Sequence, residues 1–273
     1  MTPDISEFSY GFALTQELIA LPGTTLSAAP VFPSLIEEGR AGGGYDVKLD
    51  IPGFPLFIQF KRSDCMVGKN AKEVAAPYNF IPPFYRMKIT ERSRSAQHDM
   101  LVDLDNGHNQ VFYAAPLFHR VEELNDAYLS RTVSQRSFYI RPNAIGHLDD
   151  DSHHVAFDHR RYWVFSEPRE VKGIRGEEFP TILKSRQKED VRPLRDGPIK
   201  DALDQIKAIV NKHVEFPTTQ NESPDVTGLI AVSETPDDGE IIQQLRRLAD
   251  VALLYFGAQL FIVQDSLSSD DTQ

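Results

Sequence analysis

The residues of this chain that are best suited to chemistry lie between positions 43 and 61, where an acid, an amide and a lysine occur at strand-like spacing. Asp46 belongs to a run in which polar and apolar residues alternate, which is typical of a strand with one buried face. Gln59 and Lys61 are two residues apart in the next apolar run, so their side chains point to the same side. A carboxylate and an amide oxygen are ligands for a divalent cation, and a lysine is a common phosphate binder. This grouping therefore predicts metal-assisted phosphate chemistry.

A β-hairpin is the element that would bring these residues together. We expect its strands over Tyr45–Ile51 and Leu56–Lys61, with the reversal between Pro52 and Gly53. In that register Asp46 faces the amide-bearing residue of the second strand, and cross-strand Cβ atoms lie about 5 Å apart, close enough to share one cation. A Pro-Gly turn suits a tight hairpin poorly, so a longer loop is the alternative.

The pattern formed by Asp46, a gap of twelve residues and then Gln59-Phe60-Lys61 resembles the PD-(D/E)XK nuclease superfamily, in the D…QxK form of Mrr-like restriction endonucleases. The resemblance implies an α/β fold, a restriction-endonuclease-like mixed sheet flanked by helices. It also implies Mg²⁺, with Mn²⁺ as the alternative, held by Asp46, the Gln59 side-chain oxygen and the main-chain carbonyl of Phe60. Lys61 would orient the attacking water and stabilise charge on the phosphate. Gln59 stands where most members carry an acid, so it would contribute one oxygen and no charge.

The resemblance also implies a further acid from the helix that precedes the hairpin, which we expect over Ser9–Ala20. Glu17 is the residue that we match to this catalytic and metal-binding position. Glu37 and Glu38, just before the glycine-rich entry to the first strand, are the alternatives. A solvated helix residue with no role in catalysis is the other interpretation of Glu17.

Composition places the chain among ordinary globular proteins, because 41% of its 273 residues are hydrophobic and 25% are charged. No apolar run approaches the roughly 20 residues that a membrane span needs, and the N-terminus lacks the pattern of a signal peptide. Cys65 is the single cysteine, which fits a reducing compartment. We therefore expect a cytoplasmic protein with no membrane contact.

The charge distribution bears on the expected substrate. A net charge of −11 opposes a broad attraction to nucleic acid. Basic residues nevertheless gather between Lys61 and Arg94, where they could line a groove for phosphates. We expect nucleic acid as the partner, with DNA as the first choice, and a mixed solvated surface is the alternative interpretation of this stretch.

Beyond the hairpin, strand-like and helix-like patterns alternate, as in a mixed α/β sheet. The expected strands and helices are listed in chain order: strands over Tyr85–Ile89, Val111–Ala115, Ser137–Ile140, His154–Phe157 and Tyr162–Phe165, and helices ending near Leu104 and covering Val121–Leu129 and Ile199–His213.

Three regions follow from these patterns. Residues 1–168 would form the nuclease core, residues 169–198 a polar linker or extended arm, and residues 199–273 a helical C-terminal extension with an acidic tail. The strongest helical pattern, Gly239–Phe261, has a wide apolar stripe. That stripe would pack on the chain's own core or against a protein partner or a second copy of the chain.

Two other polar patterns have simpler interpretations. The run Asp149–Asp151 is typical of a solvated turn. His153, His154 and His159 lack the cysteines or the acid pattern that would accompany a zinc site, so a strand or surface role is favoured.

The function that these observations and the resemblance favour is a metal-dependent nuclease that hydrolyses phosphodiester bonds. A role as the effector of a host-defence system against phage is a hypothesis that would explain the acidic charge and the apolar helical stripe. The alternative is a catalytically silent subunit of the same fold that serves as a binding or scaffold protein in a larger complex. The glutamine at position 59 and the negative net charge support that alternative.

Overall fold

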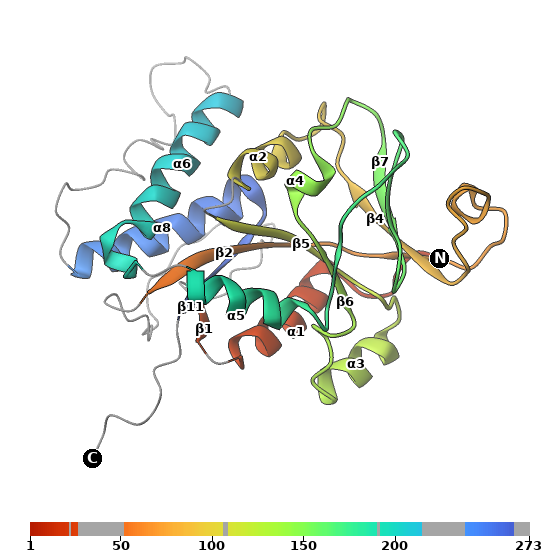
Figure 1. Cartoon of the computed structure of the whole chain (residues 1–273), viewed down its shortest axis with the longest axis horizontal. Coiled ribbons are helices and arrows are strands. Elements are labelled where there is room, and N and C mark those ends of the chain that lie inside the picture. Colours follow the sequence, from red (N-terminus) through yellow and green to blue (C-terminus); the bar gives the residue numbers. More distant parts are fainter. Residues whose placement is uncertain (22, 27–51, 106–108, 190–191, 215–237, 265–273) are drawn as a thin grey trace. The chain divides into compact units, whose positions relative to one another are not determined.

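The computed structural model describes residues 1–21, 23–26, 52–105, 109–189, 192–214 and 238–264. It is a mixed α/β structure with a mixed sheet of six strands, flanking helices and a second sheet of five strands (Figure 1). The chain divides into two compact units. Unit 1 comprises Met1–Leu18 and Ile58–Pro180, and unit 2 comprises Ile19–Phe57 and Thr181–Gln273.

The six-stranded sheet has the strand order β1-β11-β2-β5-β6-β10, and the boundary between the units falls within β2. Strands β5, β6 and β10 belong to unit 1, where β6 pairs antiparallel with both of its neighbours. Nearly every residue of β2 and β5 is buried, which explains why both read as continuous apolar runs rather than alternating ones. The strand bounds are β2 Gly53–Phe60, of which only the part from Ile58 onward belongs to unit 1, and, within unit 1, β5 Gln110–Pro116, β6 Ser137–Ile140 and β10 Ile174–Arg175.

The second sheet of unit 1 is antiparallel throughout, in the order β3-β4-β7-β8-β9. One face carries the buried residues Met87, Val155 and Val164. The other face carries Phe84 and Phe165, which form a small apolar cluster with Phe80 from the preceding segment. The strand bounds are β3 Asp64–Met66, β4 Phe84–Ile89, β7 His153–Phe157, β8 Tyr162–Phe165 and β9 Arg169–Glu170.

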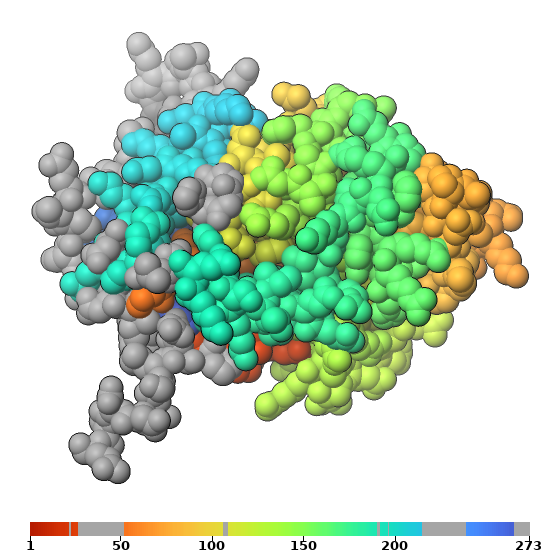
Figure 2. Space-filling model, in the orientation of Figure 1, coloured from red at the N-terminus to blue at the C-terminus, as the bar shows by residue number. Residues whose placement is uncertain are grey.

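The segment between β3 and β4 contains the short helix η1 (Lys72–Val74) and packs onto the face of the second sheet that carries Phe84 and Phe165. Figure 2 shows it in orange as a knob on the surface of unit 1, beside the green strands. The helices of unit 1 are α1 Glu7–Ile19, whose last residue lies beyond the boundary, α2 Gln97–Leu104, α3 Val121–Leu129 and α4 Pro142–Ile145. Tyr10 is the buried anchor of α1, since its hydroxyl donates to Ser137 Oγ on β6 at 2.8 Å.

Unit 2 combines a strand pair with helices. Strand β1 (Thr24–Leu26) pairs antiparallel with β11 (Gln259–Gln264). Helix α6 (Pro198–His213) packs on α8 (Asp238–Phe256), which in turn packs on β11. Helix α5 (Phe179–Glu189) and the short η2 (Leu194–Asp196) precede α6 along the chain.

Most elements lie where the sequence places them. Helix α3 and strands β6 and β8 match the expected bounds to the residue. Helix α6 and strands β4 and β7 differ by one residue at one end, and helix α1 and strand β5 differ by one or two residues at both ends. Among the described residues, no helix combines the length and apolar character that crossing a membrane requires.

The expected linker at residues 169–198 is wrong, because this segment contains β9, β10, α5 and η2. Phe179 begins α5 fully buried, with its ring stacked on Tyr139 at 3.8 Å between centroids. The expected domain limit at residue 168 also falls between β8 and β9, which are paired strands of one sheet. These elements were not predicted because the segment has few apolar residues, and only some of those, such as Phe179, are buried.

The expected helix over Gly239–Phe261 is also too long. Helix α8 ends at Phe256, and Gly257 follows with φ at 59°, the left-handed conformation that commonly ends a helix. The apolar residues after this glycine form the buried strand β11, so the C-terminal region is not purely helical. The apolar stripe of α8 is largely covered within unit 2, although Leu254 is 71% exposed. The acidic tail lies outside the described residues.

The hairpin that we expected can be judged only in its second arm. Strand β2 confirms that arm and begins at Gly53, while Pro52 forms an isolated antiparallel bridge with Pro193. A reversal centred between Pro52 and Gly53 is therefore wrong, because Gly53 is already part of the strand. The first arm, with Asp46, lies outside the described residues.

Candidate functional site

Strand β2 delivers the QFK residues to one end of the sheet in unit 1. Gln59 is 4% exposed, and Phe60 ends the strand. Lys61 continues the ladder, since its main-chain N–H donates to the carbonyl oxygen of Ala114 on β5 at 2.9 Å. The backbone of Lys61 is thus fixed by the sheet even though the strand formally ends one residue earlier.

Helix α2 holds the side chain of Gln59. The Nε2 atom of Gln59 donates to Oε1 of Gln97, the first residue of α2, at 2.5 Å. The Gln97 main-chain N–H donates to Ser95 Oγ at 3.2 Å, so Ser95 anchors the start of the helix. The amide of Gln59 is therefore oriented by a neighbouring element rather than by solvent.

The side chain of Lys61 lies on an aromatic platform. Its Nζ is 5.8 Å from the centroid of the Tyr113 ring, within the range of a cation–π interaction. Burial lowers the pKa of the Lys61 ammonium, and the nearby Glu7 carboxylate raises it again in part. A half-buried lysine with a depressed pKa is a feature that recurs at functional sites.

His98 of α2 fixes Tyr113 in turn. The Tyr113 hydroxyl is 2.8 Å from His98 Nδ1, and His98 Nε2 is 2.8 Å from the carbonyl oxygen of Gly146. A carbonyl only accepts, so Nε2 carries the proton and Nδ1 accepts from the tyrosine. Burial lowers the pKa of His98, which favours this neutral form. Gln59 and Lys61 are thus both tied to the first turn of α2, one directly and one through Tyr113.

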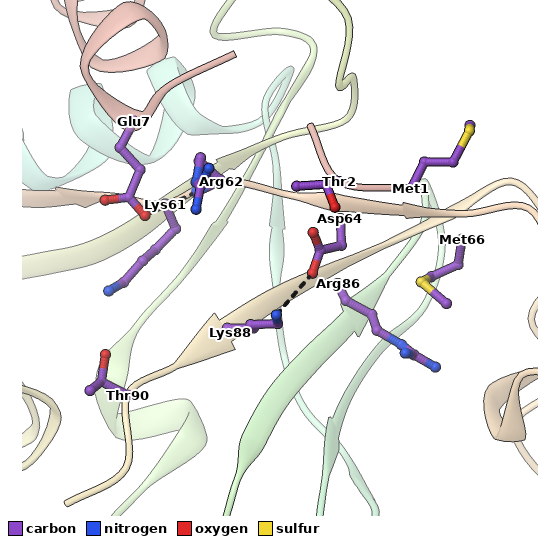
Figure 3. A pocket seen from close by; sticks show the side chains of 10 residues that line it. All are labelled: Met1, Thr2, Glu7, Lys61, Arg62, Asp64, Met66, Arg86, Lys88 and Thr90. Atoms are coloured by element: carbon purple, nitrogen blue, oxygen red, sulfur yellow. Dashed lines mark hydrogen bonds and ion pairs between the residues drawn. The ribbon is translucent and has the colours of Figure 1, made fainter. Parts of the chain in front are cut away.

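A pocket of about 420 Å³ opens beside Lys61 in unit 1 (Figure 3). Its charged lining residues come from α1, from the end of β2 and from strands β3 and β4 of the second sheet. The basic members outnumber the acidic ones; they are Lys61, Arg62, Arg86 and Lys88 against Glu7 and Asp64. The pocket is therefore suited to an anion.

Two of these cations are already engaged. Lys88 Nζ lies 3.5 Å from Asp64 Oδ2. Arg86 makes two hydrogen bonds of 2.6 Å with the carboxylate of Glu73. By contrast, Lys61 and Arg62 form no ion pair with any residue in the described part of the chain. These two adjacent cations are available to a ligand.

The acid beside Lys61 is Glu7 rather than Glu17. The Oε1 atom of Glu7 accepts the main-chain N–H of Arg62 at 3.4 Å, and Figure 3 shows its carboxylate above the Lys61 side chain. The carboxylate of Glu17 instead accepts the main-chain N–H groups of Val133 at 2.7 Å and Ser134 at 3.1 Å. Burial raises the pKa of Glu17, and these two hydrogen bonds oppose that shift.

Glu17 therefore holds the loop before β6 and does not line the pocket around Lys61. The two acids lie at opposite ends of α1, and ten residues of helix span about 15 Å. Sequence reasoning missed Glu7 because it began the helix two residues later, at Ser9. The available signal was an acid in the first helical turn, where the helix dipole favours negative charge. Glu37 and Glu38 lie outside the described residues.

The donors that the structure describes do not make a divalent cation site by themselves. No group of three or more His, Cys, Asp or Glu residues suited to a metal occurs in the described ranges. Beside Lys61 they offer the Glu7 carboxylate, the Phe60 carbonyl and the Gln59 amide, while Asp64 is paired with Lys88. Mg²⁺ is usually bound through one or two carboxylates together with waters and substrate phosphates, so Glu7 alone reaches only the lower limit. Such a site would depend on Asp46, which lies outside the described residues.

A buried ion cluster supports the wall of the pocket. Glu73 is fully buried and accepts from Arg86 and from His154 Nε2, the latter at 2.9 Å. Burial pushes the pKa of Glu73 up, but the hydrogen bonds from Arg86 and His154 outweigh it and the net pKa is lowered. Burial also lowers the pKa of His154, against the effect of Glu73. This cluster fastens the segment around η1 to the second sheet and orients Arg86.

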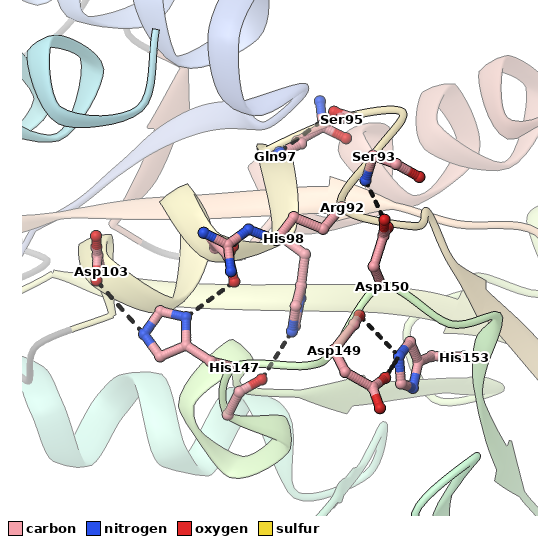
Figure 4. Close-up of polar contacts among 12 residues, drawn as sticks. Arg92, Ser93, Ser95, Gln97, His98, Asp103, His147, Asp149, Asp150 and His153 are labelled. Atoms are coloured by element: carbon pink, nitrogen blue, oxygen red, sulfur yellow. Dashed lines mark hydrogen bonds and ion pairs between the residues drawn. The ribbon is translucent and has the colours of Figure 1, made fainter.

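A second polar cluster fastens α2 itself (Figure 4). Asp99, in the first turn of the helix, lies 2.8 Å from His147 Nδ1 and 3.2 Å from Arg92 Nε. Ser93 donates its main-chain N–H to Asp150 at 2.7 Å. The loops before β7 and before α2 are thus bound to the helix that orients Gln59 and Lys61. The contacts of His147 and Asp150 could not be read from the sequence, because their partners are 48 and 57 residues away along the chain.

Comparisons with models of protein families, with curated proteins and with solved structures found no match to this chain.

Proposed function

We propose that the pocket around Lys61 binds the phosphodiester backbone of nucleic acid and is the active site of a metal-dependent nuclease. The observation that carries the proposal is the pair of cations Lys61 and Arg62, available at the end of a sheet strand beside one acid, Glu7. A phosphodiester carries a single negative charge, which such a pair matches. The sequence pattern of Asp46 and Gln59-Phe60-Lys61 supports the same chemistry.

Local charge makes this substrate compatible with an acidic chain. The net charge is −11, so attraction to a polyanion must come from a confined basic surface. The pocket lining provides that surface, with Lys61 and Arg62 at its centre. Binding should therefore weaken as salt increases, with a slope that reflects a small number of phosphate contacts.

In the proposed reaction a water oxygen attacks phosphorus and the bond to the leaving sugar oxygen breaks. Lys61 would stabilise the charge that builds on the phosphate oxygens, and Tyr113 would hold the ammonium in place. Glu7, whose carboxylate accepts the main-chain N–H of Arg62 beside the pocket, would accept a proton from the attacking water or orient that water. A Mg²⁺ ion bound with Asp46 would supply Lewis acidity and lower the pKa of a bound water.

The test is incubation of the full chain with supercoiled plasmid, linear duplex DNA and RNA, each with Mg²⁺, with Mn²⁺ and with EDTA. Wild type should cut at least one substrate in a metal-dependent way, and Lys61→Ala should lose about a hundredfold or more of that activity. Lys172→Ala, which removes an exposed lysine outside the pocket lining, is the matched control and should cut normally. Undiminished cutting by Lys61→Ala would place the chemistry elsewhere.

The second candidate is a catalytically silent nucleic-acid-binding subunit. Two observations favour it: the amide of Gln59 is held by Gln97, and the described residues hold no metal-binding cluster. The same substrates separate the two functions. Binding measured by fluorescence anisotropy that is lost in Lys61→Ala and Arg62→Ala, without cutting in any metal, would support the silent subunit.

We propose a role in defence against phage, in the cytoplasm, as the setting for either function. Cells that express this chain, together with the proteins encoded next to it, should resist phage infection in plaque assays. The Lys61→Ala variant should restore plating if nucleic-acid cleavage is the effector step, and equal protection by that variant would remove this role.

A further inference from the structure

Ser166 occupies an unusual position in the tight turn between β8 and β9 of unit 1. It is exposed, and its φ is 109°, a conformation that side-chain-bearing residues rarely adopt. The other non-glycine residues with positive φ in the described ranges, Asn79 and Arg131, lie near 53° and 54°, in the ordinary left-handed well. Backbone strain of this kind persists where surrounding contacts impose it, and it is concentrated at functional sites.

The contact that accompanies this strain is a hydrogen bond between Ser166 Oγ and Nδ1 of His153. His153 is the first residue of β7 and is 2% exposed. Its ring is therefore fixed in the sheet, while the serine that it contacts faces solvent. The arrangement places a buried base directly behind an exposed hydroxyl.

Asp149 decides which nitrogen of His153 is basic (Figure 4). Nε2 of His153 lies 2.7 Å from Asp149 Oδ1 and 3.1 Å from the main-chain carbonyl oxygen of Asp149. Both partners are acceptors, so Nε2 must carry the proton. The lone pair is then on Nδ1, and the Ser166 hydroxyl must donate to it. Serine, histidine and aspartate are thus joined in one directed chain of hydrogen bonds.

We infer that Ser166 is an activated nucleophile that accepts acyl groups from small carboxylic esters, with His153 as general base and Asp149 as the group that orients it. The order of roles is that of a serine hydrolase triad, although here the serine contacts Nδ1 and the acid contacts Nε2. This site is separate from the Lys61 pocket, whose lining includes none of the three residues.

The reaction begins when Ser166 Oγ attacks the ester carbonyl carbon and its proton passes to His153 Nδ1. Asp149 stabilises the imidazolium that forms. The ester C–O bond then breaks, and the proton passes from His153 to the departing alkoxide, which leaves as the alcohol. Water hydrolyses the acyl-serine to release the carboxylic acid. Because Ser166 lies on an exposed turn, the ester must approach from solvent, which favours short acyl groups.

The experiment uses the full chain with a fluorophosphonate, whose fluoride is displaced by an activated serine, and with p-nitrophenyl acetate. Peptide mapping should place the phosphonyl group on Ser166, and Ser166→Ala should remove it. Asp149→Asn should slow labelling about a hundredfold, because the side chain is 51% exposed and its replacement leaves the fold intact while the histidine loses its orienting charge. Turnover of p-nitrophenyl acetate should follow the same order.

Ser130→Ala is the matched control. Ser130 is another exposed serine, but its hydroxyl donates to the carbonyl oxygen of Asp126 at 2.6 Å and has no base behind it. Its removal should change neither the labelling of Ser166 nor the turnover of p-nitrophenyl acetate. Melting temperatures confirm that each variant is folded. Labelling of Ser166 no faster than of Ser130, or an equal rate in Asp149→Asn, would show that the three residues only fasten the turn and would overturn the inference.

Discussion

Lys61 lies over the ring of Tyr113, with 5.8 Å between its Nζ and the ring centroid. The hydroxyl of the same tyrosine lies 2.8 Å from Nδ1 of His98, so a side chain delivered by β2 is supported through β5 by helix α2. The ring face attracts the ammonium, and the hydrogen bond keeps the ring from turning. The position of Lys61 is therefore decided by β2, β5 and α2 together rather than by its own strand alone.

Replacement of Tyr113 by phenylalanine separates these two contributions. Tyr113→Phe keeps the ring under Lys61 but leaves the buried Nδ1 of His98 without a donor, which should lower the free energy of unfolding by about 1 to 3 kcal/mol. Urea denaturation would measure it. Tyr128→Phe, at an exposed position, should be neutral. Equal stability of the two variants would mean that the Tyr113 hydroxyl contributes nothing.

The pKa of Lys61 reports which carboxylate lies beside it. Glu7 raises the pKa of Lys61 against the effect of burial, so Glu7→Gln should lower that pKa further, whereas Glu17→Gln should leave it unchanged. NMR titration of ¹³C-methylated lysine would report the value in each variant. A larger shift in Glu17→Gln than in Glu7→Gln would contradict the assignment.

The proposed metal site depends on residues 46 and 59, and calorimetric titration with Mn²⁺ tests both. Asp46→Ala and Gln59→Leu should abolish binding, since each removes an oxygen ligand. Gln59→Glu should tighten it by adding a charge, provided that Gln97 turns its amide so that the NH₂ group faces the new carboxylate. Equal affinity of wild type, Gln59→Glu and Gln59→Leu would mean that no metal touches this position.

Acid should weaken the cluster of Glu73, Arg86 and His154. The pKa values of Glu73 and His154 are both below their ordinary values of 4.5 and 6.5, so the folded state binds fewer protons than the unfolded state. Their contribution to stability is therefore complete above pH 6.5. It falls below pH 6.5, where the imidazole of His154 binds a proton more readily in the unfolded state, and falls again below pH 4.5, where the carboxyl group of Glu73 does the same. The melting temperature of His154→Gln should decrease less than that of wild type between pH 7 and pH 5. Parallel decreases in the two proteins would exclude this linkage.

Gly23 is required where β1 begins in unit 2. Its φ is 77°, and a Cβ atom there would lie 2.0 Å from the carbonyl oxygen of Gln264 on β11. Gly23→Ala should therefore destabilise the protein by more than about 1 kcal/mol, since both the conformation and the contact oppose a side chain. Gly68→Ala is the control, because nothing lies within 4 Å of a Cβ at that position. Thermal unfolding of both variants decides the point, and equal melting temperatures would refute it.

Local patterns were sufficient for much of the fold. Alternation and apolar runs placed α3, β6 and β8 to the residue, because these elements are short, strongly patterned and bounded by polar residues. They failed at residues 169–198, where a few buried anchors such as Phe179 hold polar segments in place. They also failed after Gly257, because a helix and a buried strand have the same apolar composition and only the glycine marks the change.

For the sites, a strand period of two residues was enough to predict that Gln59 and Lys61 share one side of a strand. The position of Glu7 rather than Glu17 beside Lys61, and the meeting of Asp149 and Ser166 at His153, depend on contacts between elements that are distant in the sequence. Side-chain spacing within one element is fixed by backbone geometry, whereas contacts between elements depend on how the chain returns, which no local pattern encodes.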